Sequence, residues 1–297
     1  TVADIRGTSP KVWNAWKGKL LEDLFRYTMR TLGGRAPDAG SEVESRKREA
    51  LTMLALYTLP FEAHKDLWDT LDVGYFMRHD AQEIAWHTRQ LSRWLSQNSQ
   101  DTPPAMVRCR PSSTGEGLQI MVFAPDAPDL FARICGYFDQ AGFNIWDAKV
   151  HTATNGYALD TFQIQDTSGR QASEYRDLIS YIEYELTDRL TNNAPLPPLS
   201  KPRISRQLRH FPITPEVIIQ TDERGDYRML SIVAGDRPGL LSRISRTLTA
   251  FDINLHSAKI NTLGFRAEDT FVVSGSALNN PKTTVRFESE LLDQLRI

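Results

Sequence analysis

The residues best suited to bind a small ligand lie in a short turn, GDRPG, at positions 235–239. The turn precedes an amphipathic segment, so its backbone N–H groups lie at a helix N-terminus, where they are unpaired and the helix dipole is positive. Gly239 lets a ligand approach the backbone, and Asn254, at the start of the next expected strand, offers an amide donor and a carbonyl acceptor. This chemistry predicts a site for the amino and carboxyl groups of an amino acid, formed by Asp236, Arg237, Pro238, Gly239, Leu240 and Asn254.

The same residues also have a purely structural interpretation. Asp236 is a common type of helix N-cap, and Pro238 suits the first turn of a helix. Asn254 suits the end of a turn. The residue types alone leave both interpretations open.

The block that holds these residues occurs twice in the chain. Residues 124–152 (APDAPDLFARICGYFDQAGFNIWDAKVHT) recur as residues 234–262 (AGDRPGLLSRISRTLTAFDINLHSAKINT) in constant register. After a slip of one residue, ALDTF at 158–162 is repeated as AEDTF at 267–271. A repeat of this kind indicates two copies of one small module.

The first copy carries a weaker version of the candidate site, with Asp126, Asp129 and Asn144 at the matching positions. Asp129 replaces Gly239, and it would add a side chain and a negative charge where a ligand carboxylate is expected. We therefore expect the first copy to bind differently from the second, or not to bind.

The elements that must position these residues follow the order strand, helix, strand, strand, helix. In the first copy we predict a strand at 118–124, a helix at 128–142 that ends at a glycine, and a hairpin that turns at Asn155-Gly156. A second helix covers 173–190, and 203–211 can return as a fourth strand. This βαββαβ order is the ferredoxin-like arrangement. In the second copy, 217–222 can fill the edge from the other end of the module.

The first third of the chain differs from the repeats. Residues 11–34 carry apolar side chains every three or four positions, which predicts a helix. Capping-box patterns at Ser41-x-x-Glu44 and Asp80-x-x-Glu83 predict two more helices. The fold class is therefore α+β: an all-helical segment at 1–98, a polar linker at 99–117, and two ferredoxin-like modules at 118–211 and 212–297.

Composition excludes several classes of function. The formal charge of −2, from 35 basic and 37 acidic residues, provides no global attraction to nucleic acid or to an anionic membrane. The two cysteines are too few for a disulfide framework, which favours a cytoplasmic location. We find no signal peptide and no apolar stretch long enough to span a bilayer. Because the sequence opens on TVADI rather than on Met, we expect a C-terminal part of a longer protein.

Two motifs carry a resemblance to known proteins. The pattern DRPGLLSRI followed by INLHSAKI resembles the ACT domain, a module that binds small effectors, most often amino acids, usually where two copies pack together. The order of TVADIRGTSPKVWNAWKGKLLEDLF, YFMRHDAQEIAWHTRQL and two such modules resembles the C-terminal part of the bacterial PII uridylyltransferase/uridylyl-removing enzymes. This second resemblance covers essentially the whole chain.

The resemblance implies a role in nitrogen metabolism. In that family a nucleotidyltransferase domain uridylylates the PII signal protein, an HD-type domain removes the UMP, and tandem ACT domains read glutamine. The chain would then hold the end of the HD-type domain and both sensors, with PII as partner, L-glutamine as allosteric effector, and self-association through the ACT modules. No nucleotidyltransferase signature is found in this sequence, so we expect no catalytic residue and no uridylylation by this chain alone.

The resemblance also implies a metal for the complete enzyme, Mg²⁺ or Mn²⁺. Asp4 matches the last aspartate of the HD-type metal set, and a carboxylate suits a divalent cation that activates water. The His and His-Asp ligands of that set are not found in this sequence, so the site is incomplete and no metal is expected on this chain. His79-Asp80 spells the same motif, but Asp80 is already explained as an N-cap.

An alternative function follows from the fold class, because ferredoxin-like sheets also carry RNA-recognition domains. The aromatic strand signature of such domains is missing, and the charge is balanced. A generic amino-acid-binding regulatory module of another enzyme is the other alternative.

Overall fold

The computed structural model describes residues 39–57, 59–96, 104–113, 117–166, 175–199, 210–221 and 227–296. The chain forms two compact units, a helical one and one that holds both repeat copies. Asp4 and the helix predicted at 11–34 lie outside the described residues. No helix in the described ranges is long and apolar enough to cross a membrane.

The described part of the first unit is helical, as predicted. It contains α3 (Ala39–Leu54), α4 (Lys65–Trp68), α5 (Val73–Arg78) and α6 (Ala81–Ser96). The helix predicted from Ser41 exists, but it begins at Ala39, so Ser41 lies in its first turn and is not the N-cap.

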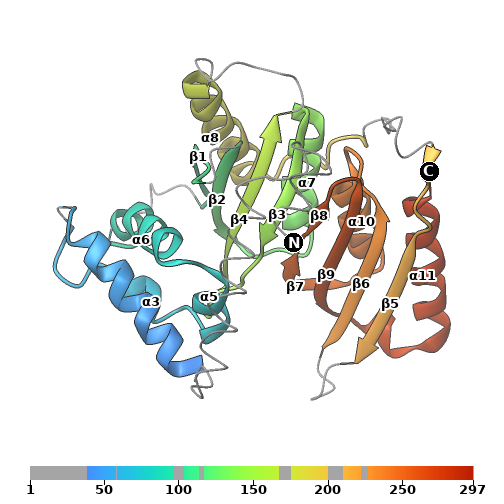
Figure 1. The fold of residues 1–297 in the computed structure, drawn as a ribbon, viewed down its shortest axis with the longest axis horizontal. Helices are drawn as coiled ribbons and strands as arrows, with labels where there is room; N and C mark the ends of the chain where they lie inside the picture. Colours follow the sequence, from blue (N-terminus) through green and yellow to red (C-terminus); the bar gives the residue numbers. More distant parts are fainter. Residues whose placement is uncertain are drawn as a thin grey trace, which may run out of the picture. The chain divides into compact units, whose positions relative to one another are not determined.

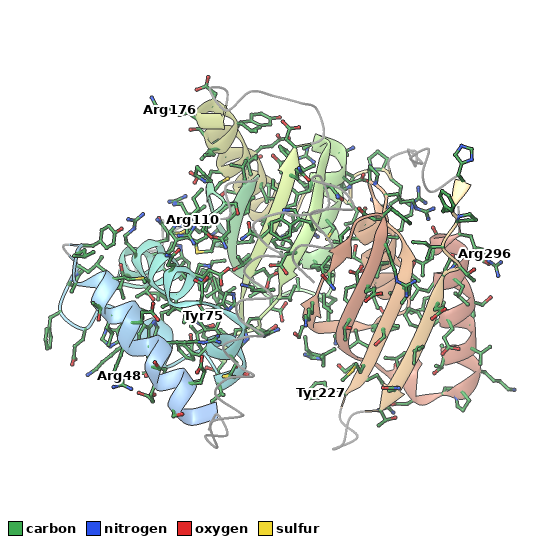
Figure 2. All side chains as sticks on the ribbon, viewed as in Figure 1. Arg48, Tyr75, Arg110, Arg176, Tyr227 and Arg296 are labelled. Carbon is green, nitrogen blue, oxygen red and sulfur yellow. The ribbon has the colours of Figure 1, made fainter. Side chains whose placement is uncertain are left out.

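The capping box before α6 is confirmed. The Glu83 amide donates to Asp80 Oδ1 at 2.9 Å, and the Asp80 amide donates to Glu83 Oε2 at 3.0 Å. Asp80 is thus a helix cap, as interpreted from the sequence. The neighbouring His87 is fully buried, with its Nδ1 2.7 Å from the hydroxyl of Tyr75, which Figure 2 labels within this helical unit.

The second unit contains both copies, which we call module 1 and module 2. Module 1 comprises β1 (Met106–Pro111), β2 (Leu118–Pro125), α7 (Leu130–Ala141), β3 (Phe143–Lys149), β4 (Tyr157–Asp166) and α8 (Tyr175–Thr191). Module 2 comprises β5 (Glu216–Thr221), β6 (Arg228–Gly235), α10 (Leu240–Ala250), β7 (Asn254–Lys259), β8 (Thr262–Leu263), β9 (Arg266–Ser274), η2 (Ser276–Asn279) and α11 (Pro281–Leu295).

Local chemistry explains where these elements begin and end. Gly142 ends α7 in the left-handed conformation, at a φ of 79°, and its amide is bonded to the last carbonyl groups of the helix. Gly156 adopts the same conformation in the hairpin before β4. Asn280 caps α11, since its side chain accepts a hydrogen bond from the Lys282 amide.

The strand order of module 1 corrects one expectation. β1 pairs with β2 and takes the edge that we assigned to 203–211, of which 203–209 lie outside the described residues. Part of the predicted polar linker is therefore a strand, in which Val107 and Cys109 are buried between more exposed neighbours. The Pro, Ser and Gly residues around this strand favour a linker, so the short alternation of buried and exposed residues was not recognised in the sequence. In module 2 the predicted edge strand is confirmed as β5, paired with β6.

Both described modules thus have the order ββαββα. In each module the first strand, β1 or β5, forms the outer edge of the sheet. The strands form one continuous antiparallel sheet in the order β1-β2-β4-β3-β7-β9-β6-β5, and Figure 1 shows the two halves side by side. The halves meet where Lys149 of β3 pairs with Lys259 of β7, and α7 packs against α10 on the same seam. Buried apolar residues of both modules belong to one continuous core.

We expect the core of module 2 to depend on Phe271, which is fully buried in β9. Replacement of a buried phenylalanine by alanine removes apolar contacts and leaves a cavity, so Phe271→Ala should lower the free energy of unfolding by about 3–5 kcal/mol. Urea denaturation followed by circular dichroism measures this. Phe265→Ala is the control, because Phe265 is 39% exposed. An equal loss in both variants would contradict the assigned core.

Candidate functional site

The seam between the modules contains two cavities that are related by the repeat. Each is lined by the loop before the first helix of one module and by the start of the strand that follows the first helix of the other module. The Asp126 cavity joins residues 126–128, 130 and 131 of module 1 to Asn254 and His256 of module 2. The Asp236 cavity joins residues 236, 237 and 239–242 of module 2 to Asn144 of module 1.

Strand pairing explains why each cavity draws on both modules. β3 and β7 are antiparallel and meet only at Lys149 and Lys259, close to the C-terminal end of each strand. The start of each strand therefore lies beside the turn that follows the other strand. The Asp126 loop is hydrogen-bonded to the turn after β3 through Gly156, and the Asp236 loop is hydrogen-bonded to the turn after β7 through Phe265. Asn254, at the start of β7, therefore lies next to the Asp126 loop, and Asn144, near the start of β3, lies next to the Asp236 loop.

This arrangement corrects the pairing expected from the sequence. Gly239 and Asn254 were expected to hold one ligand together, but Gly239 lines the Asp236 cavity and Asn254 lines the Asp126 cavity. The expectation failed because it treated each copy as a self-contained site. Residues from equivalent positions of the two copies meet across the seam instead.

The two cavities differ about tenfold in volume. The Asp236 cavity measures about 20 Å³, little more than the roughly 10–15 Å³ that one water molecule requires. The Asp126 cavity measures about 220 Å³. Of the two, the Asp126 cavity is the one with room for a small organic molecule.

Two carboxylates lie at the Asp126 cavity. Asp126 accepts a hydrogen bond from the Thr152 hydroxyl at 2.9 Å, and its own amide donates to the carbonyl of Gly156 at 2.9 Å. Asp160 in β4 is 1% exposed, and its Oδ1 accepts the amide of His151 at 3.2 Å. Negative charge at this cavity favours a ligand with a positive group.

The wall from module 2 adds neutral polar groups. His256 Nε2 is 2.7 Å from the hydroxyl of Ser274, and the His256 ring packs edge-on against Tyr227 at 4.9 Å between centroids. Figure 2 labels Tyr227 at the end of the module 2 sheet. Burial lowers the pKa of His256, opposed by the negative charge of Asp126 across the seam, so the ring is mainly neutral at neutral pH. With Asn254, it offers hydrogen bonds without a formal charge.

The Asp236 cavity also holds two carboxyl groups, and both resist ionisation. Burial raises the pKa of Asp236, opposed by hydrogen bonds from Asn144, whose Nδ2 lies 3.5 Å from Asp236 Oδ2, and from the Arg237 amide. Burial and the nearby charge of Asp236 raise the pKa of Asp269 to about 7, against the opposing hydrogen bond from the Asn261 amide.

Other residues expected at the site have structural contacts. The guanidinium of Arg237 donates to the carbonyl groups of Arg296 and Gln294, at 3.1 and 2.7 Å, and so supports the end of α11. Gly239 is the N-cap of α10, in the left-handed conformation with φ of 80°, whereas Asp236 and Pro238 precede the helix. Leu240 is the first residue of α10 and lines the Asp236 cavity.

Asp129 does not line the Asp126 cavity. Its carboxylate accepts a hydrogen bond from Arg133 Nε at 2.7 Å, one turn along α7, and it is absent from the lining of the Asp126 cavity. The position before α7 therefore differs from Gly239 in conformation, with φ of −102° at Asp129. The ion pair leaves the loop of module 1 open to a ligand.

Asp160 and Asp269 were not identified from the sequence as site residues. The repeat could have pointed to them, because Asp160 in ALDTF and Asp269 in AEDTF occupy the same position of the two copies. A carboxylate at a buried strand position is costly unless it is paired, and its recurrence in both copies marks it as functional or structurally paired. His256 was interpreted as structural, and its Ser274 contact agrees, but it also lines the Asp126 cavity.

The raised pKa of Asp269 predicts a pH-dependent stability. An unfolded aspartate has a pKa of about 3.9, so the folded protein holds a proton that the unfolded chain releases, and stability falls as the pH rises towards about 7. Asp269→Asn removes this penalty. We expect it to stabilise the protein by about 1–3 kcal/mol at about pH 8 and by little at about pH 4.

Thermal unfolding of both proteins at several pH values measures this difference. Glu268→Gln is the matched control, because the Glu268 side chain on the same strand is 40% exposed. A stability difference for Asp269→Asn that does not change with pH would show that Asp269 ionises normally.

Two separate parts of the chain each match a known protein family. Residues 38–90 match the family described as the uridylyltransferase GlnD fifth domain, and residues 228–281 match the ACT domain. The assignment of 1–98 to the end of an HD-type domain stays a prediction, as do the other domain boundaries. A crystal structure of aspartate kinase from Synechocystis is 12% identical, covers 59% of this chain and 26% of that chain, and has a TM-score of 0.32, too low to support an argument.

The similarity to curated proteins extends over the whole chain. A bifunctional uridylyltransferase/uridylyl-removing enzyme of Burkholderia lata is 52% identical over 297 residues, and that of Burkholderia thailandensis is 51% identical. In each case the match covers 100% of this chain and 34% of the relative. The resemblance noted in the sequence is thus confirmed: this chain is related along its entire length to the bifunctional uridylyltransferase/uridylyl-removing enzymes, and it spans about a third of theirs.

Proposed function

We propose that this chain is the glutamine-sensing regulatory part of an enzyme that uridylylates and deuridylylates the PII signal protein in the cytoplasm. The observation that supports this proposal most is the Asp126 cavity of about 220 Å³, shared between two repeated modules. The relatives' names supply the two activities. Glutamine, PII and the Mg²⁺ or Mn²⁺ of the complete enzyme come from the resemblance.

The chemistry of the Asp126 cavity suits a free amino acid. Asp126 and Asp160 would attract the α-ammonium group, and the N-terminal end of α7 would favour the α-carboxylate. Asn254 and neutral His256 would hydrogen-bond the side-chain amide. A neutral wall suits the amide of glutamine better than the additional negative charge of glutamate.

A ligand at the seam can regulate the complete enzyme because it contacts both modules. It shifts an equilibrium between domain arrangements only if its affinity differs between them. A site built half from each module has this property, because separation of the modules would dismantle it. In the complete enzyme, bound glutamine would favour the arrangement that removes UMP.

We expect calorimetry of the 297-residue chain to show binding of L-glutamine at the Asp126 cavity. Asn254→Ala and Asp160→Asn should each weaken binding about tenfold or more, since each removes a polar or charged contact to the ligand. Asn144→Ala is the matched control at the Asp236 cavity and should change affinity less than about twofold. Loss of binding in Asn144→Ala alone would show that glutamine binds at the Asp236 cavity. Absence of heat with the unmodified chain would contradict the proposal that this chain senses glutamine.

We expect no catalysis from the chain by itself. Asp4, the one residue matched to an HD-type metal set, lies outside the described residues, and no group of three or more His, Cys, Asp or Glu within the described ranges could hold a metal. Uridylylated PII incubated with the chain and Mg²⁺ or Mn²⁺ should therefore release no UMP, with a full-length relative as positive control. Release that a chelator abolishes would contradict this expectation.

A further inference from the structure

Module 2 has a third cavity, away from the seam. It measures about 690 Å³ and lies between α10 and α11, and we call it the α10–α11 groove. Arg243 and Arg246 from α10 and Arg286 from α11 line it. It shares no lining residue with the Asp126 or Asp236 cavities.

Two of these guanidinium groups have no carboxylate partner within the part of the chain that the structure describes. No ion pair there involves Arg246 or Arg286, and Nε and Nη2 of Arg246 are buried without a hydrogen-bond acceptor. A buried donor without an acceptor is costly. The groove thus has donors that an incoming acceptor would satisfy.

Arg286 is held in a way that keeps its donors available. Its guanidinium carbon lies over the Phe251 ring, 5.7 Å from the centroid, a cation–π contact in which no carboxylate takes part. The N–H donors point outward in the plane of a guanidinium, in a fork that matches the oxygens of phosphates and carboxylates. Phe251 therefore orients a charged group and does not neutralise it.

The first turn of α11 adds to the positive character of the groove. Asn280, its N-cap, and Thr283 both line the cavity. The N-terminal end of a 15-residue helix carries positive partial charge and favours anions. Two carboxylates also line the groove, Asp252 and Glu290, of which Glu290 accepts a hydrogen bond from Gln294 at 3.1 Å. Three guanidinium groups outnumber them.

We propose that the α10–α11 groove binds an oxyanion with two or more negative charges. Guanidinium groups from both helices would provide the charge and the forked donors, and the helix N-terminus would provide the hydroxyl of Thr283 and its dipole. The volume exceeds that of a single inorganic anion, which favours an extended ligand such as an oligophosphate or a polycarboxylate. α10 borders this groove with Arg243 and Arg246, and the Asp236 cavity with residues 240–242.

Calorimetry of the 297-residue chain with pyrophosphate tests the proposal, and citrate in a second titration distinguishes phosphate from carboxylate ligands. Binding of either supports the site, provided that sodium chloride at the same ionic strength produces no signal. Arg246→Gln and Arg286→Gln should each weaken binding about tenfold, the loss typical of one charge-assisted hydrogen bond. Glu290→Gln should strengthen binding, because it removes a repulsive charge.

Arg176→Gln is the matched control, because Arg176 is exposed at the start of α8 in module 1, where Figure 2 labels it. It should change affinity less than about twofold. Arg286 is exposed, so its variant stays informative if Arg246→Gln unfolds the protein. Absence of heat with both anions at millimolar concentration, or equal affinity in Arg286→Gln and the unmodified chain, would overturn the proposal.

Discussion

The architecture of the second unit depends on one short antiparallel contact, where Lys149 of β3 pairs with Lys259 of β7. Two lysines at paired positions repel each other, so the seam is held by the packing of α7 on α10 and by the shared apolar core rather than by these side chains. The contact nevertheless sets the geometry. It fixes which strand start faces which loop, and so determines the composition of both seam cavities.

This geometry makes the two seam cavities unequal. The Asp236 cavity measures only about 20 Å³, with Asn144 against Asp236 and with carboxyl groups whose pKa values are raised by burial. The Asp126 cavity measures about 220 Å³, and the Asp129 carboxylate beside it forms an ion pair with Arg133. The two halves of the seam thus differ in volume although both contain the same repeated block, and we propose the half with the Asp126 cavity as the binding site.

Most of the fold could be predicted from the sequence because its signals are local. Gly142 ends α7, Gly156 forms the hairpin turn and Asp80 caps α6, and each acts within a few residues of its own position. Edge pairing is not local, which is why β1 was missed in a stretch rich in Pro, Ser and Gly. The loops and asparagines that line the two seam cavities were named from the sequence. Their partners across the seam lie about 90–130 residues away, and only the strand register reveals which residues meet.

The central claim is that an amino acid binds in a cavity to which both modules contribute. A crystal structure of the chain grown with L-glutamine tests this most directly. The account predicts ligand density between Asp126 and Asp160 of module 1 and Asn254 and His256 of module 2, with the Asp236 cavity unchanged. Density within a single module, or between the Asp236 loop and Asn144, would contradict it.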